Sequence, residues 1–179
     1  MPFDFDKELS KAIDYFGERY GKADTEYRRL PVTINDKTFA ETLVDEKNKI
    51  ISVKLTATTK LSQIKYQIWH EAVHCLAPVQ RVDTLWFEEG LAVHSALNAP
   101  HMKQAYKLVC LAELRSKPVW YAPWQSFKKL NATLPQIKRI HESAPQRRFD
   151  NITPSLIIEV FATCPALADE LCQRLPFYR

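Results

Sequence analysis

The stretch at residues 60–77 constrains the fold most, because its period and its apolarity together specify a buried helix. Its apolar residues recur at spacings of three and four, which is the period of an α-helix. A helix that is apolar around most of its circumference lies deep in a protein, and Pro78 ends this one. The remaining face carries His70 and His74. The apolar residues are Leu61, Ile64, Ile68, Ala72 and Leu76, with Trp69 and Val73 beside them.

The residues before this helix predict a helix and a small sheet. Residues 4–17 place their apolar side chains on one helical face, which predicts an amphipathic opening helix. In residues 31–58 the pattern changes, and polar breaks separate three strand-like runs. Ile51, Val53 and Leu55 alternate with polar residues, as in a half-buried strand. These runs indicate a small antiparallel meander.

The residues after it predict further helices. The chain has only 3 glycines against 11 prolines, so helices stopped by proline should dominate. Helices are predicted at about 85–98 and 102–116, each followed by a proline. Residues 120–150 are interrupted by proline, and residues 154–175 predict one or two closing helices. The predicted fold class is therefore α+β, with a small antiparallel sheet followed by a mainly helical region around the central helix.

Length and composition predict one domain of a cytoplasmic protein. The 179 residues suit a single domain over 1–179, with helix and sheet at about 1–58 and the helical part at about 59–179. No stretch resembles a membrane span or a signal peptide. The 4 cysteines form no CxxC pair and indicate reduced thiols. The net charge of +4 comes from scattered basic residues, so we expect no nucleic-acid partner. The sequence does not predict an oligomeric state.

Residues 70–74 read His-Glu-Ala-Val-His, which is an HExxH motif inside the predicted central helix. Residues four positions apart project from the same side of a helix, so His70 and His74 can bind one metal ion. Two neutral imidazoles favour zinc over magnesium or calcium. Glu71 lies beside the ligands and can contact a metal-bound water. We therefore expect one zinc ion per chain, with Glu71 as the catalytic base.

A catalytic zinc ion needs three protein ligands and one open position, so a third ligand is expected nearby. Residues 86–92 read Trp-Phe-Glu-Glu-Gly-Leu-Ala. With the HExxH motif, this W-x-x-E-G-x-A segment resembles the gluzincin branch of the zincin metallopeptidases. The resemblance implies a zincin-like fold, peptidase activity and Glu89 as the third zinc ligand. The 14 residues between His74 and Glu89 are a few fewer than in the best-known gluzincins, so the connection must be tight.

Three other residues compete with Glu89 for the metal. Glu88 is adjacent, but it lies about 100° away on the helix and falls at an x of the family pattern. His94 shares the helical face of Glu89 poorly and is interpreted as a supporting or packing histidine. Cys75 has apolar neighbours, which favours a buried, inert thiol. Gly90 is unfavourable in a helix, and we interpret it as a close approach of this helix to the metal helix.

These residues predict a zinc-dependent peptidase that acts on peptide or protein substrates. Zinc lowers the pKa of its bound water, Glu71 takes the proton, and the water attacks the polarised carbonyl. By resemblance, the strand before the metal helix, residues 49–56, would pair with an extended substrate. No acidic residue is an obvious partner for the outer nitrogens of the histidines, so a backbone carbonyl is expected there.

The remaining roles stay open. The family also uses a tyrosine or histidine to stabilise the oxyanion, and we predict Tyr121, in a proline-flanked aromatic segment. An inactive zincin-like binding module is the alternative function, although a scaffold has no need of Glu71 beside the ligands. A structural zinc site is a third hypothesis, and it would need a fourth protein ligand. The other candidates for the oxyanion are Tyr106, His101 and His141.

Overall fold

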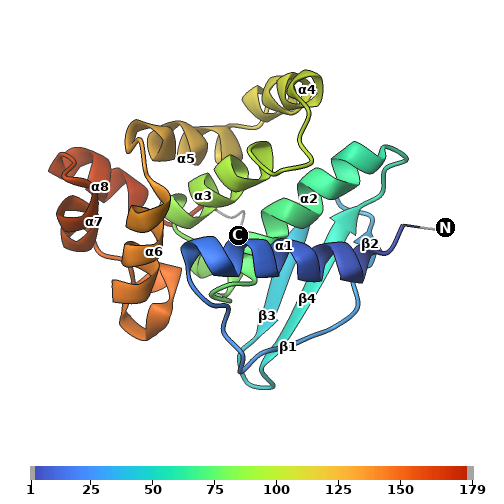
Figure 1. The fold of residues 1–179 in the computed structure, drawn as a ribbon, viewed down its shortest axis with the longest axis horizontal. Coiled ribbons are helices and arrows are strands. Elements are labelled where there is room, and N and C mark those ends of the chain that lie inside the picture. Colours follow the sequence, from blue (N-terminus) through green and yellow to red (C-terminus); the bar gives the residue numbers. More distant parts are fainter. Residues whose placement is uncertain (1–2, 177–179) are drawn as a thin grey trace.

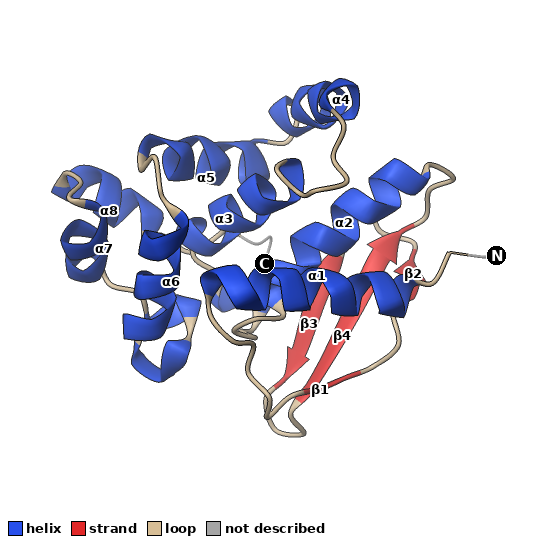
Figure 2. Cartoon of the chain, viewed as in Figure 1, coloured by secondary structure: helices blue, strands red, loops and turns tan. Residues whose placement is uncertain are grey.

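The computed structural model describes residues 3–176, in which one small sheet is followed by a succession of helices (Figures 1 and 2). The predicted α+β class is confirmed. The single domain over residues 1–179 stays a prediction. The strands are β1 (Arg28–Arg29), β2 (Thr33–Asn35), β3 (Glu41–Asp45) and β4 (Ile50–Thr56). The helices are α1 (Phe5–Tyr20), α2 (Leu61–His74), α3 (Trp86–Leu97), α4 (Gln104–Arg115), α5 (Pro118–Lys129), α6 (Leu134–Ser143), α7 (Pro154–Phe161) and α8 (Pro165–Leu171).

The sheet is mixed, so the predicted antiparallel meander is wrong. β4 is the central strand, and β1 and β2 both pair with it in parallel along one edge. β3 pairs with the other edge of β4 in antiparallel register, with Thr42 opposite Val53. The alternation of Ile51, Val53 and Leu55 marks a buried face, and these three side chains are indeed buried. Alternation identifies a face but not the neighbouring strand, which explains the error.

Helix α2 occupies the position that its sequence predicts. Its second half is buried, including Ile68, Trp69 and Ala72. The first residue is not, since Leu61 is 48% exposed, and Ile64 packs against the core while only partly buried, so the predicted apolar stripe contributes to the core mainly in its later part. α2 packs on β4 and on α1, where the Trp69 indole donates a hydrogen bond of 2.8 Å to Glu8. Figure 1 shows α1 and α2 across the sheet.

The helical part surrounds α3. The predicted helices at 85–98 and 102–116 are confirmed as α3 and α4, and residues 120–150 contain α5 and α6. Pro118, Pro154 and Pro165 stand at the first residue of α5, α7 and α8, where a missing N–H costs nothing. Of the helices within residues 3–176, none combines the length and apolarity that crossing a membrane requires.

Candidate metal centre

The cluster of candidate metal ligands lies where the end of α2 meets the start of α3. His70 and His74 project from the last turns of α2, and Glu89 projects from the first turn of α3. The two Nε2 atoms of the histidines are 3.3 Å apart. Glu89 Oε1 lies 3.3 Å from His70 Nε2, and Glu89 Oε2 lies 3.5 Å from His74 Nε2. The sequence motif therefore brings together the three side chains that it predicts.

These distances suit a metal ion. Tetrahedral ligands at about 2.0–2.2 Å from zinc lie about 3.3–3.6 Å apart, which the separation of the two Nε2 atoms matches, and Glu89 presents one oxygen to each histidine at a similar distance. Glu89 Oε1 is buried and has no hydrogen-bond partner among the described residues, so it is available to bind a cation. His70, His74 and Glu89 could thus hold a metal ion.

The charges within the cluster keep Glu89 ionised. Burial alone would raise the pKa of Glu89, but the neighbouring His70 and His74 hold that pKa well below its ordinary range. Burial alone would lower the pKa of His74, yet its contacts with Glu88 and Glu89 raise the pKa well above its ordinary value. Glu89 is therefore ionised at neutral pH, and a cation bound between the three side chains would replace a proton on His74.

Glu88 is the functional residue that the sequence interpretation missed. Its side chain is fully buried, and Oε1 lies 2.7 Å from His74 Nδ1. This hydrogen bond holds one proton of His74 on Nδ1, so a cation bound at the cluster would replace the proton on Nε2. The predicted backbone carbonyl is thus replaced by a carboxylate. The sequence signal for this role was the position of Glu88 directly before Glu89. Successive residues of a helix differ by about 100° in direction, so Glu88 can reach the other side of the His74 ring.

Glu71 lies beside the ligands without belonging to the cluster. It is 3% exposed, and the Thr42 hydroxyl donates a hydrogen bond of 2.8 Å to its Oε2. Its Oε1 is 4.0 Å from His70 Nε2. One carboxylate oxygen is thereby held by β3, and the other faces the cluster. This arrangement suits a proton acceptor better than a fourth ligand.

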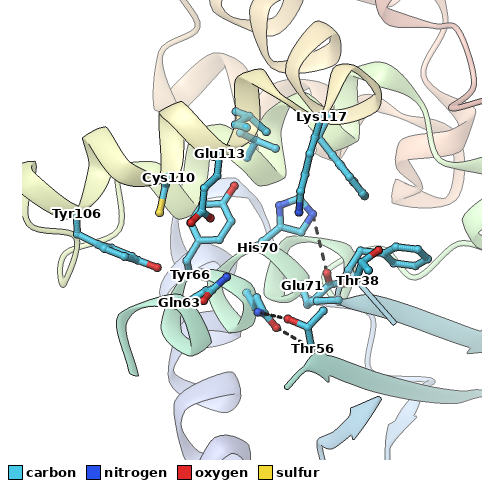
Figure 3. A pocket seen from close by; sticks show the side chains of 16 residues that line it. Thr38, Thr56, Gln63, Tyr66, His70, Glu71, Tyr106, Cys110, Glu113 and Lys117 are labelled. Atoms are coloured by element: carbon cyan, nitrogen blue, oxygen red, sulfur yellow. Dashed lines mark hydrogen bonds and ion pairs between the residues drawn. The ribbon is translucent and has the colours of Figure 1, made fainter. Parts of the chain in front are cut away.

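Two adjoining pockets reach the cluster. The smaller one, called here the centre pocket, is lined by His70, His74, Glu89 and Glu71 together with the start of β3. The larger one, called here the side pocket, shares His70 and Glu71 and extends between α2, α4 and the start of α5 (Figure 3). Residues 38–40, which precede β3, line the side pocket. Both pockets thus give access to the same two motif residues.

The edge strand beside the pockets is β3, whereas the predicted strand at 49–56 reaches only the side pocket, through Thr56. β4, which covers that range, has β1 and β2 on one edge and β3 on the other, so it offers no edge to a substrate. β3 pairs only with β4 within the described chain, and its first residues line the centre pocket. The prediction failed because the strand preceding a helix in sequence need not be the edge strand of the sheet.

The other candidate ligands lie apart from the cluster. His94 packs against Phe127, with ring centroids 5.5 Å apart. Cys75 is buried, and burial raises the pKa of its thiol to about 12, which keeps it inert. Neither residue belongs to the metal-ligand cluster found among the described residues.

The candidates for the oxyanion are scattered. Tyr121 packs against Trp124, with ring centroids 5.7 Å apart, and lines neither pocket. His101 packs against Trp69, and His141 lies near Phe149 and Gly21, so neither lines these pockets. Tyr106 is the one candidate in the side pocket. The role of Tyr121 stays a prediction that its position does not support.

Gly90 makes a close approach, but to a helix other than the one predicted. A Cβ atom at this position would lie 2.5 Å from Phe127 Cβ and 2.6 Å from the carbonyl oxygen of Pro123. Both neighbours belong to α5, whereas the prediction named the metal helix. Gly90 thus fixes α3, and the Glu89 carboxylate with it, against α5.

The chain matches no protein-family model, no curated protein and no solved structure.

Proposed function

We propose that the chain is a zinc-dependent peptidase of the gluzincin type. One observation carries the proposal: the centre pocket is lined at once by the three candidate ligands and by Glu71. A hydrolytic metal site needs this combination, because substrate must reach both the ion and the base. Two imidazoles and one carboxylate favour zinc over the harder ions magnesium and calcium.

The surrounding residues support catalysis over a structural role. A structural zinc site has four protein ligands, whereas the cluster among the described residues offers three. Cys75 and His94, the other residues considered as ligands from the sequence, are not part of it. Glu71 also argues against an inactive binding module, because a buried carboxylate that coordinates nothing is costly without a chemical role.

The chain supplies the proton transfer and the orientation of the reacting groups. Zinc, when bound, makes water more acidic and polarises the substrate carbonyl. Glu71 Oε1 accepts the proton of the attacking water and returns it to the leaving amine. Thr42 fixes the other oxygen of Glu71, and Glu88 fixes the tautomer of His74. The free edge of β3 offers backbone groups for pairing with an extended peptide.

Separate substitutions test the metal ligands and the base. Protein purified without added metal should contain nearly one zinc ion per chain, and His70→Ala or His74→Ala should abolish it. Glu71→Gln should keep the zinc and the melting temperature but lose cleavage of a peptide library, because this side chain acts on water. Elemental analysis and mass spectrometry of the digests measure both. Full zinc in either histidine variant, or cleavage by Glu71→Gln, would refute the proposal.

A further inference from the structure

The side pocket has a polar end that the proposed reaction does not use. Figure 3 shows Tyr66, Tyr106, Cys110 and Glu113 gathered on one side of the pocket, away from Glu71. Tyr66 stands one helical turn before His70 on α2, and the other three project from α4. The pocket is continuous from His70 and Glu71 to this polar end, so a side chain that starts beside the cluster can extend toward it.

Glu113 gives this end of the pocket an unbalanced negative charge. The side chain is exposed, and within residues 3–176 no lysine, arginine or histidine forms an ion pair with it. Its charge also acts on its neighbours. The pKa of Tyr106 and that of Cys110 are raised by burial and further raised by Glu113, so both groups stay neutral.

The other charges at the side pocket belong to its metal end. Lys117 lies four residues beyond Glu113, at the N-cap of α5, and its ammonium sits over the ring of Trp120, 5.3 Å from the centroid. Trp120 in turn contacts Phe39 of the sheet side, with ring centroids 6.0 Å apart. The Lys117 ammonium thus contacts the aromatic pair that lines this part of the pocket. Glu113 is left as the charged group at the polar end.

We infer that the side pocket selects a basic side chain, lysine or arginine, flanking the scissile bond. The inference rests on the proposed function and names its substrate class. A lysine or arginine side chain entering from the metal end would donate charge-assisted hydrogen bonds to Glu113 and gain cation–π attraction from Tyr66 and Tyr106. An apolar side chain of equal length would form neither the ion pair with Glu113 nor the cation–π contacts and would gain less.

Binding to an inactive, zinc-loaded protein tests this selection apart from turnover. The Glu71→Gln variant is mixed with acetylated peptides that differ at a single position, which carries either lysine or norleucine. The position is moved across the peptide, and affinities are measured by calorimetry. At the best position the lysine peptide should bind about fivefold tighter or better, because one partly exposed ion pair contributes about that much. Added salt should reduce the difference.

Two charge variants in the same background provide the comparison. Glu113→Gln should remove the difference between the two peptides, whereas Lys117→Gln should preserve or increase it. Lysine and norleucine peptides of equal affinity at every position would overturn the inference. Selective binding followed by no cleavage in the wild-type protein would retain the pocket and refute the peptidase. Cleavage without any preference for lysine or arginine would support the peptidase and refute the selection by the side pocket.

Discussion

Two adjacent glutamates contact the histidines of the candidate metal centre from different sides. Glu89 faces both His70 and His74, whereas Glu88 contacts only His74, from the side of its Nδ1 atom. A helix turns by about 100° per residue, so neighbouring side chains in one turn reach opposite sides of a facing residue. Both glutamates lie in the first turn of α3, where the helix dipole favours negative charge.

Substitution of each glutamate should separate the two roles. Glu88→Gln keeps an acceptor for His74 but loses the charge, so zinc affinity should fall about 10–100-fold, as for other residues that orient a ligand. Glu89→Gln removes a charged ligand, so zinc affinity should fall further than in Glu88→Gln. His94→Asn, a matched change on α3 away from the cluster, should leave the affinity unchanged. Competition with a chromophoric chelator measures all three. A larger loss in Glu88→Gln than in Glu89→Gln would reverse the assignment.

At the scale of elements, patterns within one segment were predictable and pairings between distant segments were not. The period of residues 60–77 predicted α2 and placed His70 and His74 on one face, because helical geometry is local. The pairing of β2 with β4 depends on the path of the chain between the strands, which no local sequence pattern predicts. The neighbour of Gly90 and the partner of His74 also depend on packing between helices. In both cases the sequence indicated that the residue makes a close contact but not which residue it contacts.

The contact of α3 with α5 predicts opposite effects at two glycines. Gly90→Ala would place a methyl group against the backbone of Pro123, so we expect a loss of about 1–3 kcal/mol and weaker zinc binding. Gly17→Ala is the control, because a Cβ there meets nothing within 4 Å and lies inside α1. It should stabilise the protein by about 0.5–1 kcal/mol. Urea unfolding measures both, and equal stabilities would contradict this account of Gly90.

At the scale of the whole molecule, the far end of the chain holds the start of α3. The Trp86 amide donates to the carbonyl of Gln173 at 2.8 Å, and the Leu175 amide donates to that of Thr84 at 3.0 Å. These bonds satisfy backbone groups at a helix end that has no side-chain cap. The orientation of the ligand-bearing turn therefore depends on residues that lie far away in sequence, which is why motif spacing alone does not specify it.

Three histidines outside the metal centre should make the stability of the whole molecule depend on pH. Burial lowers the pKa of His94, of His101 and of His141. The unfolded chain has histidine pKa values near 6.5, so below about that pH it binds protons that the folded protein does not. The free energy of unfolding should therefore be highest above pH 6.5 with respect to these groups and should fall on acidification.

His141 offers the clearest test of this dependence because it is only 1% exposed. We expect His141→Asn to lose less stability than the wild-type protein between pH 7 and pH 5, since asparagine cannot take up the proton in the unfolded chain. Urea unfolding in the presence of a chelator compares the two, so that His70 and His74 titrate without metal in both proteins. The absolute stability of the variant is irrelevant, because the comparison concerns the slope. Parallel pH profiles would show that His141 accepts its proton in the folded protein and that its burial does not oppose the charge.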